Sequence, residues 1–313
     1  MNKHAEKVLV TGGSGFIGSN LVKELKDRGY DVWICDLKHD SQTNFLRCDI
    51  SKYRQVENIF TTHDFDYVFH AAAEYGRWNG EDYYENLWLS NVIGTKNILR
   101  MQEKKNFRMI FFSSAEVYGD YNKVMSEDVM DKIPIKQMND YAISKWVNEL
   151  QIINSANTFN TETVRVRLFN LYGPGEHYTT YRGWIPKFIY KAICDEPFTV
   201  YLGHKRTLEY VTDICRTFAN ILDNFKPGEI YNFGGEKQYE IKYVSDLILS
   251  YLGKNDSKVT YREVEPFTTK IKMPDSLKAK KDLDFNLSIS VEEGIPLTIK
   301  WFKELYNSKI NNY

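Results

Sequence analysis

Residues 7–18 read KVLVTGGSGFIG, an apolar run followed by a loop with glycines at positions 12, 15 and 18. The run predicts a buried strand over residues 7–11. The apolar side chains from Phe16 to Leu25 share one face of a helix expected over residues 16–28, which Gly29 is placed to end. Glycines at such a turn let the backbone approach a pyrophosphate, whose charge meets free N–H groups at the start of the helix. The segment therefore predicts the start of a dinucleotide-binding βαβ unit.

An acidic residue ends the next expected strand. Asp36 lies 18 residues beyond Gly18 (36 minus 18), where a carboxylate can bind the ribose hydroxyls of an adenosine. It would repel a 2′-phosphate, and no arginine follows at positions 37–39, so NAD is favoured over NADP. Asp49 and Ile50 could flank the adenine, although a solvated loop acid is an equal alternative for Asp49.

Further apolar runs alternate with helical segments through the first half of the chain. Strands are expected over residues 31–36, 66–70, 107–113 and 163–168, each too apolar to be half exposed, as in a parallel sheet covered by helices. From about residue 171 the loops lengthen and carry more Gly and Pro. We expect an α/β protein with a Rossmann-type doubly wound parallel sheet. Residues 1–170 would form the NAD-binding domain and residues 171–313 a smaller substrate-binding region, with about 229–250 returning to the sheet.

Composition excludes several other classes. The 313 residues include 41 Lys+Arg and 42 Asp+Glu, so no nucleic-acid or anionic-membrane partner is expected. No stretch reaches the roughly 18–20 apolar residues of a membrane span, and the charged start leads directly into a strand, which predicts a cytosolic location. The four cysteines show no CxxC spacing, so we interpret them as buried thiols and expect no disulfide and no metal site.

A second signal lies in YAISK at residues 141–145. Tyr141 and Lys145 are four residues apart on an expected helix, so they share one face, and the ammonium could lower the pKa of the phenol and reach a nicotinamide ribose. An exposed helical pair is the alternative. Ser113 and Ser114 strengthen the catalytic interpretation because they end an expected strand, where ligands of open parallel sheets bind.

Six motifs together resemble the extended short-chain dehydrogenase/reductase family, in particular its nucleotide-sugar epimerases, dehydratases and decarboxylases. They are GGSGFIG at 12–18, HAAA at 70–73, SSAEVYG at 113–119, YAISK at 141–145, LFNLYGPG at 168–175 and EYVTD at 209–213. The resemblance implies NAD as cofactor, and it implies these cofactor-binding residues: Gly12, Gly15, Phe16, Ile17, Gly18, Asp36, Asp49, Ile50, Ala71, Tyr141 and Lys145.

The resemblance also implies the chemistry. Ser114 would bind the reacting oxygen of the sugar, Tyr141 would remove the C4 hydroxyl proton, and Lys145 would assist it. Glu116 is typical of dehydratases and decarboxylases, because a carboxylate there can remove the C5 proton that a 4-ketone acidifies. We therefore expect a nucleotide-sugar 4,6-dehydratase, although Ala115 stands where many of these enzymes carry an acid for the leaving hydroxyl.

Several other functions stay open. A decarboxylase of the UDP-glucuronate type needs no such acid, and a 4-epimerase shares the first step. Glu116 could also serve only to order the substrate or backbone. A dehydrogenase that releases NADH and a non-catalytic NAD-binding protein are further alternatives, the last disfavoured by the intact Ser114, Tyr141 and Lys145.

The remaining resemblance concerns the nucleotide-diphosphate sugar and a partner subunit. Arg206 is similar to an arginine that binds phosphate, and Lys272 replaces a second such arginine of relatives. Asn170 matches a substrate-binding asparagine, Lys187 lies in a segment that builds the nucleobase pocket, and Glu74 should border the sugar. Surface roles for Lys187 and Lys272 are equal alternatives. Helices near residues 87–101 and 141–153 resemble those of a four-helix homodimer interface.

Overall fold

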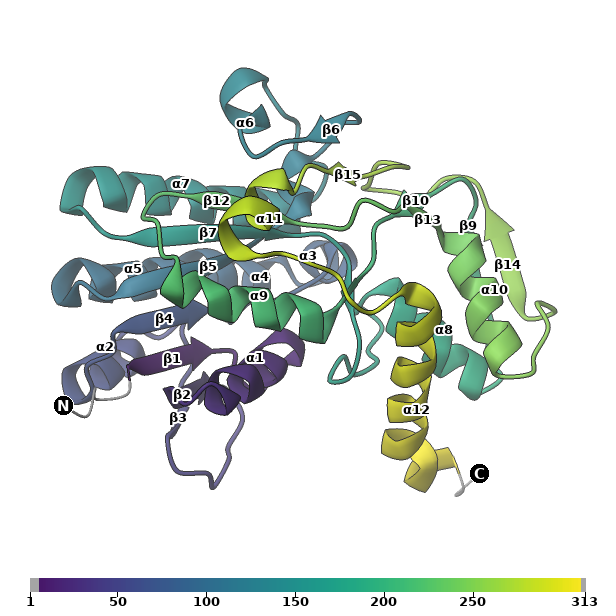
Figure 1. Cartoon of the computed structure of the whole chain (residues 1–313), viewed down its shortest axis with the longest axis horizontal. Coiled ribbons are helices and arrows are strands. Elements are labelled where there is room, and N and C mark those ends of the chain that lie inside the picture. Colours follow the sequence, from purple (N-terminus) through teal and green to yellow (C-terminus); the bar gives the residue numbers. More distant parts are fainter. Residues whose placement is uncertain (1–5, 311–313) are drawn as a thin grey trace.

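A seven-stranded parallel sheet forms the centre of the computed structural model, which describes residues 6–310. The strands follow the order β12-β7-β5-β4-β1-β2-β3 (Figure 1). Their bounds are β1 Lys7–Thr11, β2 Asp31–Asp36, β3 Phe45–Arg47, β4 Tyr67–His70, β5 Arg108–Ser114, β7 Thr163–Leu168 and β12 Ile230–Phe233. The expected doubly wound parallel sheet is confirmed. β3 was not predicted from the sequence, because it is a three-residue edge strand without a continuous buried run.

The order of the strands decides where a ligand can bind. The chain builds outward from β1 through β2 to β3, and then returns so that β4 pairs with the other side of β1. The connections therefore diverge between β1 and β4, which opens a crevice at the carboxyl ends of these strands. Thr11 and His70, at those two ends, are register partners, and their side chains are joined by a 2.8 Å hydrogen bond.

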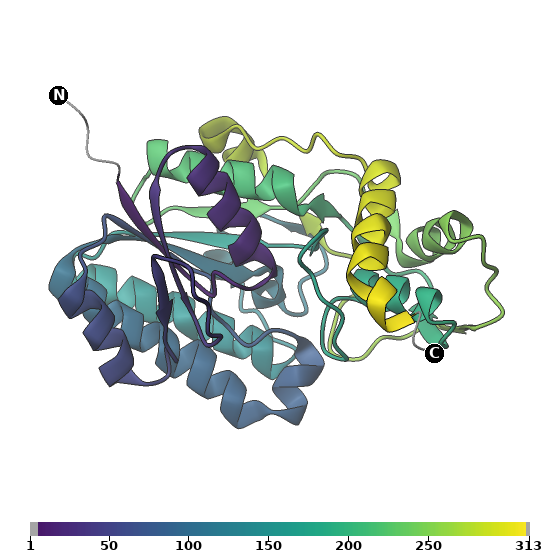
Figure 2. The same ribbon diagram turned by 90° about the horizontal axis from the view of Figure 1, so that it is seen from below.

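Helices cover both faces of the sheet, as Figure 2 shows. Val8 and Val10 of β1 belong to the core beneath one helical layer, and Leu9, which points the other way, belongs to the core beneath the second. The first layer is formed by α1 Phe16–Asp27, α9 Val211–Asp223 and α11 Leu277–Leu283, and the second by α2 Tyr53–Thr62, α5 Gly94–Lys105 and α7 Asp140–Phe159.

A second group of elements lies beside the sheet, with a core of its own. It contains α8 Trp184–Ile193, β9 Phe198–Tyr201, α10 Ile241–Tyr251, β14 Val259–Arg262 and α12 Val291–Ile310. In the 229–250 segment, β12 pairs with β7 of the main sheet. Helix α10 does not return with it, because its buried residues Ile241, Val244 and Ile248 pack in this second core. The division of the chain at about residue 171 stays a prediction.

The remaining elements are short. They are α3 Arg77–Asp82, α4 Tyr84–Leu87, the π-helical segment η1 Trp88–Ile93, the 3₁₀ turn η2 Ala115–Tyr118, β6 Val124–Met125, α6 Val129–Lys132, β8 Leu171–Tyr172, β10 Lys205–Arg206, β11 Glu209–Tyr210, β13 Tyr239–Glu240 and β15 Met273–Pro274. Between β14 and β15 runs an irregular segment, residues 263–272, which we call the 263–272 loop.

Candidate functional site

The loop between β1 and α1 requires glycine at two positions. Gly12 has a φ of +71°, and a Cβ there would lie 2.8 Å from backbone atoms of Ala72. A Cβ on Gly18 would lie 2.1 Å from the carbonyl oxygen of Gly12, so the first turn of α1 packs directly on the loop. No side chain caps α1 at Gly15, which leaves N–H groups of its first turn available to an anion. This cradle fits a dinucleotide pyrophosphate.

Asp36 ends β2 beside the glycine loop. Its Oδ2 accepts a hydrogen bond from the backbone N–H of Ser14 at 2.9 Å, so the carboxylate also holds the loop against β2. Asp49 and Ile50 follow the neighbouring β3, and the carboxylate of Asp49 accepts from the N–H of Ser51 at 2.9 Å. These three residues surround the end of the cleft where the adenosine of a dinucleotide would lie.

The residues predicted from the sequence line a single cleft with a volume of about 640 Å³. It contains the predicted cofactor residues Gly12, Gly15, Phe16, Ile17, Gly18, Asp36, Asp49, Ile50 and Ala71, the catalytic candidates Ser114, Glu116, Tyr141 and Lys145, and the substrate candidates Glu74, Asn170, Lys187, Arg206 and Lys272. The cleft therefore brings together all the candidates.

The candidate catalytic residues come from two elements that meet at the crevice. Ser114 ends β5, while Tyr141 and Lys145 lie in the first two turns of α7, and all three side chains are buried. The ammonium of Lys145 donates to the carbonyl oxygen of Phe112 at 2.8 Å. Burial lowers the pKa of Lys145 to about 7, although the nearby carboxylate of Glu149 opposes the shift. Lys145 can therefore gain or lose a proton near neutral pH.

One expectation about this pair is wrong for the structure. We expected Lys145 to lower the pKa of Tyr141, but burial raises it above the usual range, and a hydrogen bond with Ser114 opposes the rise only in part. The ammonium lies 5.9 Å from the centre of the Tyr141 ring and is bonded to a backbone carbonyl instead. Desolvation therefore outweighs the charge of Lys145.

Lys272, which is buried, forms an ion pair with the partly buried Glu116 inside the cleft. The Nζ of Lys272 lies 2.6 Å from Oε1 of Glu116. Burial would raise the pKa of Glu116, but Lys272 and Arg77 outweigh it and bring the value to about 2. Burial lowers the pKa of Lys272 to about 8, although the charge of Glu116 raises it in part. At neutral pH the pair is thus a weakly basic carboxylate beside an ammonium that can donate a proton. We expected Lys272 to bind a substrate phosphate, but in this structure its ammonium donates a hydrogen bond to Glu116.

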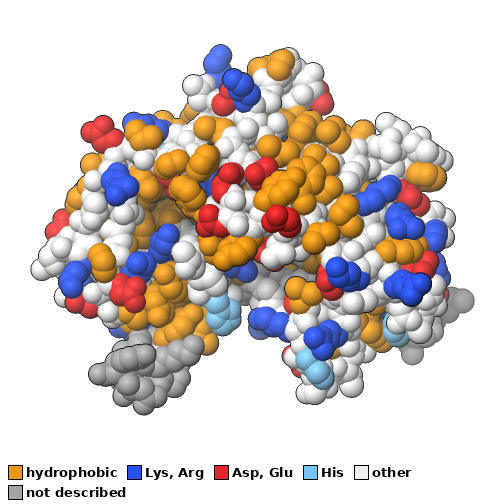
Figure 3. Space-filling view, turned by 180° about the vertical axis from the view of Figure 1, so that it is seen from behind, with side chains coloured by type: hydrophobic (Ala, Val, Ile, Leu, Met, Phe, Trp, Pro, Cys, Tyr) orange, Lys and Arg blue, Asp and Glu red, His pale blue; other side chains and the backbone are white. Residues whose placement is uncertain are grey.

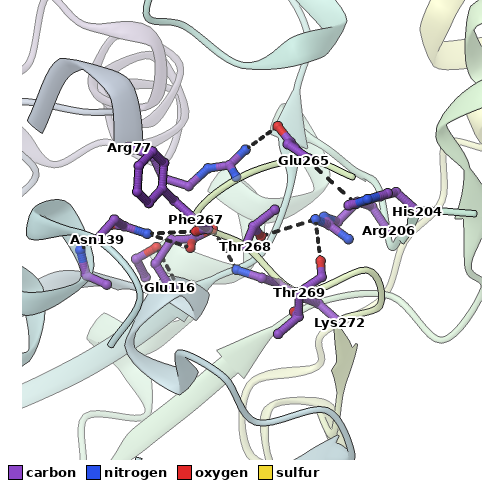
Figure 4. Close-up of polar contacts among 12 residues, drawn as sticks. Arg77, Glu116, Asn139, His204, Arg206, Glu265, Phe267, Thr268, Thr269 and Lys272 are labelled. Atoms are coloured by element: carbon purple, nitrogen blue, oxygen red, sulfur yellow. Dashed lines mark hydrogen bonds and ion pairs between the residues drawn. The ribbon is translucent and has the colours of Figure 1, made fainter. Parts of the chain in front are cut away.

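The 263–272 loop crosses the cleft and binds its cations (Figure 4). Arg206 is buried, and its two terminal nitrogens donate four hydrogen bonds of 2.8–3.3 Å, to the hydroxyl of Thr268 and to the carbonyls of Lys205, Thr269 and Lys270. Arg77 forms a 2.7 Å ion pair with Glu265. The phosphate contact expected for Arg206 therefore requires its terminal nitrogens to exchange partners.

The other predicted substrate residues have separate environments. The carboxylate of Glu74 accepts from the side-chain amide of Asn79 at 2.9 Å. The backbone N–H of Asn170 donates to Glu209 at 2.8 Å, which fixes the turn after β7. Lys187 lies on α8, and burial lowers the pKa of its ammonium.

Several cleft or adjoining residues were not predicted as site residues. The ring of Tyr75 meets the ring of Tyr141 edge-on at 5.6 Å, and Glu176 is a buried carboxyl whose pKa burial raises to about 7. Asn139 is the N-cap of α7. The sequence carried a signal for it, because asparagine is a preferred N-cap residue and lies two positions before Tyr141. Glu265 gave no signal, because it lies in a loop without a motif.

Two further findings bear on the classes excluded from the sequence. Within residues 6–310, no helix has the length and apolar character to cross a membrane. In the same described part of the chain, no group of three or more His, Cys, Asp or Glu side chains could hold a metal ion. The cytosolic location stays a prediction.

Comparison with known proteins decides the family. Residues 8–234 match the NAD dependent epimerase/dehydratase family. The chain belongs to this family. Its relatives include decarboxylases, 4-epimerases and a 4,6-dehydratase, so it is an NAD-dependent enzyme of nucleotide sugars, and the extended short-chain dehydrogenase/reductase resemblance is confirmed.

Individual relatives match over almost the whole chain. A UDP-N-acetyl-alpha-D-glucosaminuronate decarboxylase of Bacillus cytotoxicus is 32% identical over 96% of this chain and 99% of its own length. A UDP-glucuronate 4-epimerase of Thermodesulfobacterium geofontis is 30% identical over 95% and 96%. The solved structure of an epimerase of Methanothermobacter thermautotrophicus is 28% identical, with a TM-score of 0.89 over 98% of this chain and 95% of that one.

Proposed function

We propose that this enzyme decarboxylates a nucleotide-linked hexuronate after oxidation at C4. The observation that carries the proposal is the Glu116–Lys272 pair, in which a proton donor with a pKa of about 8 lies 2.6 Å from a carboxylate with a pKa of about 2. Decarboxylation of a β-keto acid requires a proton donor and no base, and this pair supplies that combination.

The first step uses the residues at the crevice. Bound NAD supplies the hydride acceptor for C4 of the sugar. Tyr141 takes the proton of the C4 hydroxyl in its phenolate form, which requires the bound cofactor and substrate to lower the pKa that burial raises. The hydroxyl of Ser114 donates to the same oxygen as it becomes a ketone. Lys145 can lose or gain a proton near neutral pH because its pKa is about 7, and it lies on the same face of α7 as Tyr141. Burial of all three groups excludes water from the reacting atoms.

The second step follows from the position of the new ketone. A C6 carboxylate is β to a ketone at C4, so the C5–C6 bond can break with its electrons passing to the C4 oxygen, and carbon dioxide leaves. Ser114 and Tyr141 stabilise the resulting enolate by hydrogen bonding. Lys272 then protonates C5, and Glu116 keeps it charged beforehand, since the carboxylate raises the pKa that burial lowers. Return of the hydride to C4, with a proton from Tyr141 to the C4 oxygen, would regenerate NAD and leave a nucleotide-linked pentose.

The 4,6-dehydratase expected from the sequence is the second candidate. Its support is the placement of Glu116 in the cleft, two residues after Ser114. It requires Glu116 to remove a proton from carbon, but a carboxylate with a pKa of about 2 is a weak base. It also requires an acid for the leaving hydroxyl, and Ala115 offers none.

Two observations support a hexuronate as substrate. Arg77, Arg206 and Lys272 all line the cleft and offer cations to an additional carboxylate. The two relatives at 30% identity or more described above are named for UDP-linked hexuronates, one as a decarboxylase and the other as a 4-epimerase.

Incubation with nucleotide-linked hexuronates and hexoses tests the proposal. We expect a hexuronate to lose the mass of carbon dioxide and, in deuterated water, to take up one deuterium at C5. Lys272→Gln should lower kcat at least about 100-fold, because a general acid contributes on that scale. Arg262→Gln, which changes an exposed cation outside the cleft lining, is the control. Loss of water from a hexose would favour the dehydratase, and C4 inversion of a hexuronate at constant mass would favour an epimerase.

We also propose that the chain forms a homodimer through its α4, η1 and α7 helices. Tyr84, Leu89, Ile93, Ile143 and Leu150 are 37–47% exposed on these elements. Figure 3 shows hydrophobic side chains gathered near the middle of the face opposite that of Figure 1. An apolar patch of this kind is typical of a subunit interface.

A further inference from the structure

Asn139 occupies the start of the helix that carries Tyr141. Its side chain is buried, and its Oδ1 accepts the backbone N–H of Ala142 at 2.8 Å, which makes it the N-cap of α7. Serine and aspartate cap helices about as well as asparagine. Capping alone therefore does not require an amide at this position.

The amide nitrogen of the same side chain points away from α7 and into the site (Figure 4). It donates to Oε2 of Glu116 at 3.4 Å and to the carbonyl oxygen of Phe267 at 3.2 Å. Lys272 holds the other carboxylate oxygen, Oε1, at 2.6 Å. The two oxygens of Glu116 are thus bound from opposite sides, one by the cap of the catalytic helix and one by the end of the 263–272 loop.

We propose that Asn139 is a positioning residue that fixes the orientation of the Glu116 carboxylate between Tyr141 and Lys272 and couples the 263–272 loop to the start of α7. The proposal rests on the proposed function at one point, because that function assigns the Glu116–Lys272 pair its role in the reaction. The contacts themselves do not depend on which bond of the sugar breaks.

The charges around Glu116 explain why orientation matters. Lys272, Arg77 and Arg206 all stabilise its charge, and Tyr141 and Tyr75 also interact with it electrostatically. Arg77 competes with Lys272 for the carboxylate. Without the amide of Asn139, Oε2 loses a donor and the carboxylate can turn toward Arg77. Lys272 would then lose the partner that keeps it protonated.

Two substitutions separate positioning from capping. Asn139→Ser keeps the cap but is too short to reach Glu116, and Asn139→Asp keeps the cap but places a like charge beside it. Asn139→Ser should keep a melting temperature closer to that of the wild type than Asn139→Ala, which loses the cap. Asn139→Asp should lower the melting temperature, because its buried carboxylate faces Glu116 and the carbonyl of Phe267. We expect kcat to fall about tenfold in Asn139→Ser, the scale of one hydrogen bond to a charged group, and further in Asn139→Asp.

A direct titration of Lys272 in the NAD-bound protein gives a readout that capping would not move. It follows the ¹³C signal of the Lys272 ε-carbon, assigned by its loss in Lys272→Arg. Asn139→Ser should lower the pKa of Lys272 below about 8, because its carboxylate partner turns away, and Asn139→Asp should raise it, because a negative charge is added.

The outcomes distinguish this proposal from the proposed function. If the wild type decarboxylates no hexuronate but the Lys272 titration shifts in the two directions, the proposed function fails and the positioning role stands. If Asn139→Ser retains the wild-type kcat and titration, the positioning role is overturned even where decarboxylation is found. A lower kcat with an unchanged titration would overturn it as well, because Asn139 would then act by another route.

Discussion

Glutamine in place of Glu149 removes the carboxylate that pairs with the buried guanidinium of Arg167. Glu149 is fully buried on α7, and its oxygens accept from Nε and Nη2 of Arg167 at 2.9 and 2.8 Å and from the hydroxyl of Ser113 at 2.5 Å. Glutamine has one acceptor oxygen, and its NH₂ group would face N–H donors. The charge of Arg167 would then be left buried and unpaired.

Removal of one partner of a buried ion pair costs about 3–5 kcal/mol. For a chain of this size we expect the melting temperature of Glu149→Gln to fall by roughly 5–8 °C, measured by calorimetry near neutral pH. The control is Glu162→Gln, because Glu162 pairs with Arg108 at the surface, with both side chains nearly half exposed. Its effect should stay below about 1 kcal/mol.

A double replacement tests the same reasoning in the opposite direction. Methionine at both 149 and 167 exchanges the Glu149–Arg167 pair for apolar packing, and part of the lost stability should return. The remainder stays lost because Arg165, which also pairs with Glu149 at 3.4 Å, keeps a buried charge without its carboxylate. The single variant should also lower the pKa of Lys145 below about 7, because Glu149 opposes the lowering caused by burial. Two results would refute the idea that the unpaired charge sets the loss of stability. One is a decrease in the free energy of unfolding below about 1 kcal/mol in Glu149→Gln, and the other is a double variant that is less stable than the single one.

Two further predictions concern pH and assembly. Burial raises the pKa of Glu176 from its ordinary 4.5 to about 7, so between these values the folded state holds a proton that the unfolded chain has released, and stability falls as the pH rises through this window. Glu176→Gln should therefore gain up to roughly 3 kcal/mol over the wild type near pH 8 and little near pH 4, measured as melting temperatures. An equal gain at both values would contradict this. In sedimentation velocity, Leu89→Lys should convert the proposed dimer to a monomer, whereas Leu277→Lys, an exposed change on the opposite helical layer, should not. A monomeric wild type would rule the dimer out.

The cofactor end of the site was predictable because its signals are local. Gly12, Gly18 and Asp36 lie within one βαβ unit, and glycine is required there by backbone contacts inside that unit and with the neighbouring strand end. Short-range periodicity likewise predicted β1 and α1. The edge strand β3 gave no such pattern and was missed.

The polar network at the sugar end was not predictable from local pattern. Glu116 and Lys272 are 156 residues apart, and Arg77 and Glu265 are 188 apart, so these pairs form only when the 263–272 loop closes on the sheet. Arg206 illustrates a second reason, because most of its acceptors are backbone carbonyls, which every residue type offers. The direction of the Tyr141 pKa shift was predicted wrongly from helix spacing, because the shift is set by burial, which depends on the elements packed around α7.

The 263–272 loop already neutralises or hydrogen-bonds much of the positive charge in the cleft. Arg77 is paired with Glu265, Lys272 with Glu116, and Arg206 with loop carbonyls and a hydroxyl. When an anion enters the cleft, these cations give up their present partners and bind the anion instead. The affinity of the anion is therefore the difference between the interactions that form and those that are lost. Such an exchange favours a ligand that can satisfy several cations at once over a small monovalent anion, which can replace only one partner.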